Sequence, residues 1–406
     1  MNELMKILKK EKKNEWVSGI VPGLLFHMCL SIVYCWSLVK VNIDAYVVGN
    51  TSWAFSVMVF VLALTAIFSL DYIEKHTKDA ARYGAVLFSV GMIGSGLSCQ
   101  LNSLTGLFIF FGGCLGMGAG LIYQVPLKII SKWFKEKKKG FFGKLFILLS
   151  TLSSFVMVPA VKNMVEKHGV VSTFTIFGII CLGILMLASW LLEEPEGVIH
   201  EEKKSINKVM KIKRLIKDFH ELPGLTLLWV ILFLNLSVGL ALISCERDIM
   251  LVSGFPIVAG MALARISMPI GKGLFGPIMK HIDKGNLYKT WWIIFSLNIL
   301  ASFISLVARS GMWFSVILIN LGYGASFILQ PSLIADLYGK RKIARVYCLL
   351  LTAWAAAGLF GNQIAEEVYK NGEGPGMIML ILGILSTLGL VLSIIFKWFY
   401  KFETRK

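Results

Sequence analysis

Long apolar runs separated by short polar segments dominate the chain. Each run approaches the roughly 20 residues that an α-helix needs to cross a hydrocarbon core about 30 Å thick. Twelve runs cover approximately residues 17–39, 52–70, 83–99, 104–127, 141–161, 171–192, 224–245, 254–275, 288–308, 311–332, 346–368 and 376–397. The pattern therefore predicts an all-α membrane protein of twelve transmembrane helices, with the lipid bilayer as its surroundings.

The composition supports a membrane location. Of the 406 residues, 56% are hydrophobic and only 16% are charged. A chain this apolar cannot hide its surface inside one water-soluble core. The first run is too long for a cleaved signal peptide and lacks a small-residue cleavage site, so we expect it to remain as a helix.

The net charge is +17, and the way its basic residues are distributed indicates membrane topology rather than a nucleic-acid partner. Basic residues gather in alternate polar segments, including the N-terminal tail, residues 128–144, the central segment and the C-terminal tail. The intervening segments keep few, such as Lys40 and Lys370. Because cytoplasmic loops carry the excess of Lys and Arg, we expect both termini in the cytoplasm and a multi-pass protein of the inner (plasma) membrane.

The longest polar segment divides the runs six and six. The predicted domains are an N-terminal six-helix bundle over 1–192, a cytoplasmic central loop over 193–222 and a C-terminal six-helix bundle over 223–406. Leu-Gly-Met-Gly-Ala at 115–119 returns as Leu-Gly-Tyr-Gly-Ala at 321–325, each followed by a proline. This echo indicates duplication, although small residues that let helices pack closely in lipid would also explain the glycines.

Three longer stretches carry a family resemblance that covers nearly the whole chain. They are Gly116-x-Gly118-x-Gly120-x-x-Tyr123-x-x-Pro126 continuing to Gly140, Leu228-Trp229 continuing to Ile243-Ser244, and Tyr323-Gly324 continuing to Ala357-Gly358. With Tyr34-Cys35-Trp36-Ser37, they resemble the oxalate/formate antiporter-like branch of the major facilitator superfamily, and more weakly the monocarboxylate transporters. The resemblance implies a twelve-helix major facilitator fold, in which two six-helix bundles enclose a central cavity and work by alternating access. The loop at 71–76 departs from the superfamily's usual G-x-x-x-D-R.

Two cations lie within the eighth run. An ionisable group at mid-depth costs at least about 2.5–3.5 kcal/mol, so each is a candidate functional residue. Arg265 and Lys272 are seven residues apart, which places both on one face of a helix. If both point into a cavity, they suit a carboxylate, which a guanidinium can hold bidentately. The resemblance implies the same role, because these families place a substrate-binding arginine at the position of Lys272. Lys272 could instead extend to the cytoplasmic interface.

Further residues could line the cavity and supply aromatic walls or hydrogen bonds, with interhelical packing as the alternative. They are Tyr34, Trp36, Tyr123, Gln124, Asn235 and Trp354. Trp354 stands where oxalate-specific members resembling this chain carry a lysine, which favours a monocarboxylate over oxalate. His27 could serve proton coupling, or simply hydrogen-bond a neighbouring helix.

No Asp or Glu falls in the middle of a predicted run, and Glu246 is placed just past the end of the seventh. Proton-driven transporters often use carboxylate relays within the membrane. The sequence therefore favours anion exchange over proton symport as the mode of transport.

The sequence gives little support to other classes of function. There is no GxSxG, HExxH or GxxxxGK[ST], and the seven cysteines show no metal-ligand spacing, so we expect no enzyme activity, no cofactor and no metal. The prediction is a monomeric secondary transporter of small organic anions. Two alternatives stay open: a major facilitator exporter of other small molecules or drugs, and a membrane ligand sensor.

Overall fold

The structure is a computed structural model that describes residues 16–133, 136–193, 221–222, 224–282, 286–339 and 342–404. The described residues contain helices and no strands. The chain divides into two compact units, Met1–His200 and Glu201–Lys406, which we call unit 1 and unit 2. Most of the predicted central loop lies outside the described residues.

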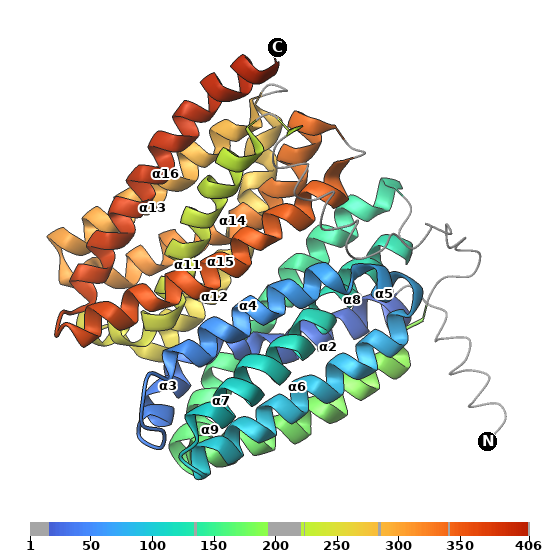
Figure 1. The fold of residues 1–406 in the computed structure, drawn as a ribbon, viewed down its shortest axis with the longest axis vertical. Helices are drawn as coiled ribbons and strands as arrows, with labels where there is room; N and C mark the ends of the chain where they lie inside the picture. Colours follow the sequence, from blue (N-terminus) through green and yellow to red (C-terminus); the bar gives the residue numbers. More distant parts are fainter. Residues whose placement is uncertain are drawn as a thin grey trace. The chain divides into compact units, whose positions relative to one another are not determined.

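Unit 1 begins with a nearly continuous helix. It is built from η1 (Trp16–Ile20), α2 (Val21–Leu30), η2 (Ser31–Cys35) and α3 (Trp36–Asp44). The helices that follow are α4 (Ser52–Phe68), α5 (Leu70–Lys75), α6 (Thr77–Gln100), α7 (Leu104–Leu107), η3 (Phe108–Leu115), α8 (Gly116–Trp133) and α9 (Glu136–Leu191). Helix α6 packs between α8 and α9, and α8 also contacts α4 (Figure 1).

Unit 2 consists of longer helices joined by short turns. They are α11 (Leu225–Ser253), α12 (Ile257–Lys280), η4 (Leu287–Lys289), α13 (Thr290–Val307), η5 (Arg309–Gly311), α14 (Met312–Tyr338), α15 (Ile343–Lys370) and α16 (Pro375–Thr404). The main pairs in contact are α12 with α14, α11 with α15 and α13 with α16. Gly254 ends α11 with a φ of 70°, a left-handed conformation that glycine adopts readily, and the chain turns there into α12.

The predicted twelve-helix architecture is confirmed. Among the described residues, ten helical segments are long and apolar enough to cross a membrane. The run at 52–70 forms the 17-residue α4. The run at 141–161 forms the part of α9 before Gly169, where a φ of 75° and a ψ of 169° separate two helices.

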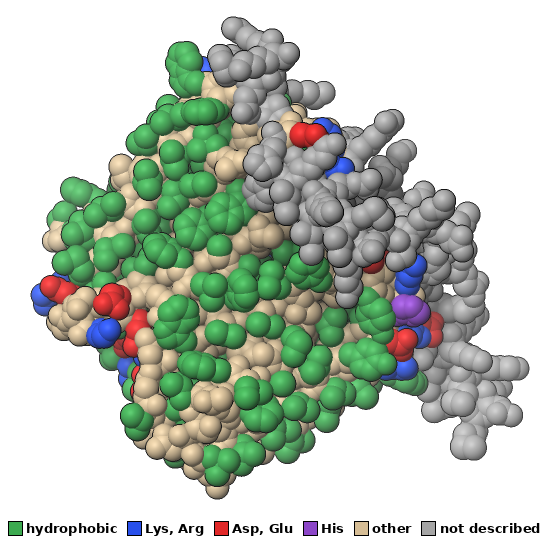
Figure 2. Space-filling model, viewed as in Figure 1, with side chains coloured by type: hydrophobic (Ala, Val, Ile, Leu, Met, Phe, Trp, Pro, Cys, Tyr) green, Lys and Arg blue, Asp and Glu red, His purple; other side chains and the backbone are tan. Residues whose placement is uncertain are grey.

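The outer surface of both units is apolar, as a lipid environment requires. Figure 2 shows hydrophobic side chains over most of the visible surface, with charged side chains gathered toward its edges. Among the most exposed large side chains are Phe303, Val307 and Trp398, which are 63%, 70% and 72% exposed. A water-soluble protein would bury most large apolar side chains of this kind in its core.

The glycine pattern serves close helix packing. A Cβ atom on Gly324 of α14 would lie 2.2 Å from the carbonyl oxygen of Met268 on α12. One on Gly118 of α8 would lie 2.3 Å from the backbone nitrogen of Phe88 on α6. These helices approach until only a hydrogen fits between them, so the packing explanation of the glycines applies in both units.

Candidate functional site

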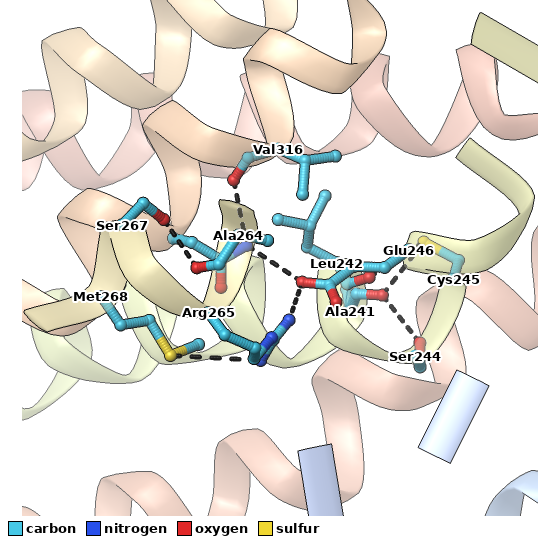
Figure 3. A network of polar contacts seen from close by, with 11 residues as sticks. Ala241, Leu242, Ser244, Cys245, Glu246, Ala264, Arg265, Ser267, Met268 and Val316 are labelled. Atoms are coloured by element: carbon cyan, nitrogen blue, oxygen red, sulfur yellow. Dashed lines mark hydrogen bonds and ion pairs between the residues drawn. The ribbon is translucent and has the colours of Figure 1, made fainter. Parts of the chain in front are cut away.

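A buried charge cluster joins three helices of unit 2. Arg265 of α12 donates from Nη2 to Oε1 of Glu246 on α11 (Figure 3). Asn320 of α14 donates from Nδ2 to the same oxygen over 3.0 Å. Asn320 also donates to the carbonyl oxygen of Val316, 2.9 Å away. The side chains of Arg265 and Glu246 are both 0% exposed. The chain turns at Gly254, so α11 and α12 follow each other in sequence and are in contact. This contact brings Arg265 and Glu246 together.

The predicted end of the seventh run at residue 245, which put Glu246 just outside it, is therefore wrong. Helix α11 continues to Ser253 instead of ending near residue 245, so Glu246 lies within a candidate membrane span. The polar sequence Glu246-Arg247-Asp248 resembles a loop, yet tertiary packing buries its first residue completely. The charge of Arg265 is consequently neutralised by a neighbouring helix.

Lys272 lies two turns further along α12 in different surroundings. It is half-buried, and its Nζ lies 5.8 Å from the ring centroid of Phe327 on α14. Within the described ranges, no carboxylate forms an ion pair with it. Helix α12 continues to Lys280, so Lys272 lies eight residues before the last residue of the helix. The two cations thus share a helix, but of these two only Arg265 has a carboxylate counter-charge among the residues that the structure describes.

A small pocket in unit 2 lies beside Phe327. Its walls come from α11, α14 and α15 and include Leu232, Phe327, Gln330, Tyr347 and Trp354. The Phe327 and Trp354 rings meet edge to face with their centroids 5.6 Å apart. Lys272 therefore contacts one face of an aromatic group that also lines this pocket. A cation beside an aromatic-walled pocket can bind an anion with a short apolar part.

Asn235 lies elsewhere in unit 2 and bonds another helix. Its Oδ1 accepts a hydrogen bond of 3.3 Å from Nδ2 of Asn298 on α13, and both residues are 1% exposed. The structure thus gives Asn235 an interhelical contact and places it outside the residues that line the pocket.

In unit 1, Trp36 and Gln124 pack into the helix bundle. Trp36 is 1% exposed and stacks on Phe55, with ring centroids 5.3 Å apart. Gln124 donates from Nε2 to the carbonyl oxygen of Ala66 on α4, 3.5 Å away. These contacts match the packing alternative for both residues.

The remaining candidates of unit 1 are half-buried. His27 and Tyr123 face each other from α2 and α8 with ring centroids 6.1 Å apart, and His27 Nδ1 lies 3.2 Å from the carbonyl oxygen of Gly23 on its own helix. Tyr34 lies in η2. The structure brings His27 and Tyr123 together, an arrangement that the sequence did not predict.

Sequence reasoning missed three residues of this region: Glu246, Gln330 and Phe327. Glu246 falls in a polar stretch typical of a loop, and Phe327 is one aromatic residue among many in apolar runs. Gln330 carries a usable signal, because it is an amide within an apolar run immediately before Pro331. The described residues contain no group of three or more His, Cys, Asp or Glu side chains that could hold a metal ion.

Known proteins similar to this chain are membrane transporters. It is 23% identical over 399 residues to an oxalate:formate antiporter of Oxalobacter formigenes, covering 94% of this chain and 91% of that protein. It is 20% identical over 347 residues to an uncharacterized MFS-type transporter, YhjX, of Escherichia coli strain K12, covering 83% of this chain and 84% of the relative.

Solved structures share the fold at low sequence identity. The peptide transporter POT, solved in complex with alafosfalin, gives a TM-score of 0.69 at 12% identity and covers 95% of this chain and 94% of its own. The fucose:proton symporter FucP of E. coli gives 0.58 at 13% identity, covering 91% and 98%. Residues 25–362 match the Major Facilitator Superfamily, and with its helical architecture this chain belongs to that family of membrane transporters.

Proposed function

We propose that this transporter carries small organic anions, foremost monocarboxylates, by alternating access. The observation that carries the proposal is the difference between the two cations of α12. Arg265 is neutralised by Glu246, whereas Lys272 has no carboxylate partner among the described residues and lies over a ring that lines a pocket. An uncompensated cation at a partly buried site favours an anionic ligand and repels a cationic one.

The contacts favour Lys272 over Arg265 as the cation that we propose to bind the substrate. The sequence favours Arg265 for bidentate binding, but Glu246 already occupies one edge of its guanidinium. Lys272 is thus the primary candidate for the substrate carboxylate, and Arg265 holds α11 and α12 together. One cation satisfies one carboxylate, and Trp354, a neutral residue, lines the nearby pocket. Both features favour a monocarboxylate over oxalate.

The mode of coupling needs its own measurement. The sequence favours exchange because it predicts no membrane-embedded carboxylate, and the position of Glu246 removes that reason. We retain exchange as the first arrangement to test, since the similar protein of Oxalobacter formigenes is an oxalate:formate antiporter. The distribution of basic residues supports a plasma-membrane protein with both termini in the cytoplasm, and we expect it to act as a monomer.

The test is uptake of labelled formate, lactate and oxalate into proteoliposomes that are preloaded with each acid or left empty. We expect Lys272→Ala to abolish uptake and Lys272→Arg to retain most of it, because the arginine restores the charge. Lys280→Ala is the matched control on the same helix, since Lys280 is exposed at its end. Stimulation by internal anion would establish exchange, and stimulation by an inward proton gradient would establish symport.

Two results would overturn the proposal. One is the absence of flux for all three acids in a correctly folded protein, which would favour the exporter or sensor alternatives. The other is acid flux that Lys272→Ala leaves unchanged, which would place the anion elsewhere.

A further inference from the structure

Gln330 of α14 is a buried amide that no other described residue satisfies with a hydrogen bond. It is 3% exposed, and neither Oε1 nor Nε2 has a hydrogen-bond partner among the described residues. Other buried amides do form such bonds: Asn298 donates to Asn235, and Asn320 donates to Glu246. Burying an amide without a partner costs about 1–3 kcal/mol, so this arrangement calls for a specific explanation.

The surroundings of Gln330 point to a ligand. It lines the pocket described above, whose other walls are mostly leucine and aromatic side chains. Ser326 also lines this pocket, but its hydroxyl already donates to the carbonyl oxygen of Tyr323 over 2.7 Å. Gln330 follows Phe327 by three residues, which places both on the same face of α14. Gln330 therefore lines the same pocket as Phe327, the residue whose ring lies 5.8 Å from the Nζ of Lys272.

An amide and a hydroxyl are complementary because each can donate and accept a hydrogen bond. A second carboxylate could only accept from Nε2, and it would place negative charge beside Oε1 without another cation. We propose that Gln330 is a specificity-determining residue that recognises the hydroxyl of a small hydroxy monocarboxylate, while Lys272 holds the carboxylate. This inference rests on the proposed function and narrows its substrate class.

The experiment compares acids that differ only by a hydroxyl: lactate with propionate, and glycolate with acetate. Initial rates in proteoliposomes give kcat/KM for each acid with the wild type and with Gln330→Met, which keeps the length of the side chain and removes its polar atoms. We expect the wild type to prefer the hydroxy acid by about tenfold or more, because the unhydroxylated acid leaves the amide unpaired. In Gln330→Met the ratio should fall to about 1, mainly through loss of hydroxy-acid transport.

A second measurement, independent of transport, tests whether the amide bonds within the protein. Gln330→Met should unfold at the same or a higher temperature than the wild type without substrate, because no internal hydrogen bond is lost. Gln100→Met is the matched control, since Gln100 is exposed at the end of α6, and it should leave the hydroxy-acid preference unchanged.

The outcomes separate this inference from the proposed function. Wild-type flux without a hydroxy-acid preference, or an equal loss of both acids in Gln330→Met, would overturn the role of Gln330 and leave anion transport standing. A marked fall in the unfolding temperature of Gln330→Met would also overturn it. If the wild type moves no carboxylate at all, the proposed function fails and the inference fails with it.

Discussion

Arg265 on α12 and Glu246 on α11 neutralise each other inside unit 2, where both side chains are 0% exposed. Removing one partner should destabilise the protein far more than removing both. Glu246→Gln and Arg265→Gln are each expected to lower the free energy of unfolding by about 3–5 kcal/mol, because each leaves one buried charge. The double variant should recover most of this loss. Unfolding measured in detergent as a double-mutant cycle checks the coupling, and additive losses would contradict it.

An exposed ion pair in unit 1 should behave differently. Lys128 Nζ lies 3.2 Å from Oε1 of Glu74, and their side chains are 29% and 42% exposed. Water screens such a pair, so Glu74→Ala should change the free energy of unfolding by no more than about 1 kcal/mol. The same unfolding assay measures it. If Glu74→Ala lowered the free energy of unfolding as much as Glu246→Gln, the contribution of these ion pairs to stability would not depend on their exposure.

The contact between α12 and α14 should tolerate no side chain at Gly271. A Cβ there would lie 2.1 Å from the carbonyl oxygen of Leu321, and a backbone atom cannot move aside cheaply. We expect Gly271→Ala to lower the thermal unfolding midpoint by several degrees, at a cost of about 1–3 kcal/mol for overpacking. Gly273→Ala on the same helix is the control, because nothing lies within 4 Å of its Cβ. Equal effects of the two substitutions would contradict the close approach.

Trp36 should contribute to stability rather than to substrate affinity. Its ring packs against Phe55 and Phe111, with centroids 5.3 and 4.9 Å away. Trp36→Ala is expected to cost about 3–5 kcal/mol of stability and to leave the KM of the folded fraction unchanged. Trp398→Ala, at a position 72% exposed, should cost less than about 1 kcal/mol. A raised KM with unchanged stability in Trp36→Ala would instead place Trp36 at the substrate site.

The fold was predictable because the membrane imposes strict local rules. A segment in hydrocarbon must satisfy its own backbone, so an apolar run of sufficient length predicts a helix without knowledge of its neighbours. The helix ends were less predictable. The run at 224–245 predicted its helix, but α11 continues through Glu246 to Ser253, because contacts from α12 and α14 stabilise a charge that would otherwise favour water.

The sequence by itself determined the membrane class, the twelve helices and the presence of two cations seven residues apart on α12. Only the tertiary structure decided what each cation faces, because that depends on side chains supplied by other helices. Glu246 neutralises Arg265 from a position 19 residues away, whereas Phe327, 55 residues after Lys272, offers that cation an aromatic face and no charge. Helical periodicity places two residues on one face, but it cannot say which neighbour will neutralise them.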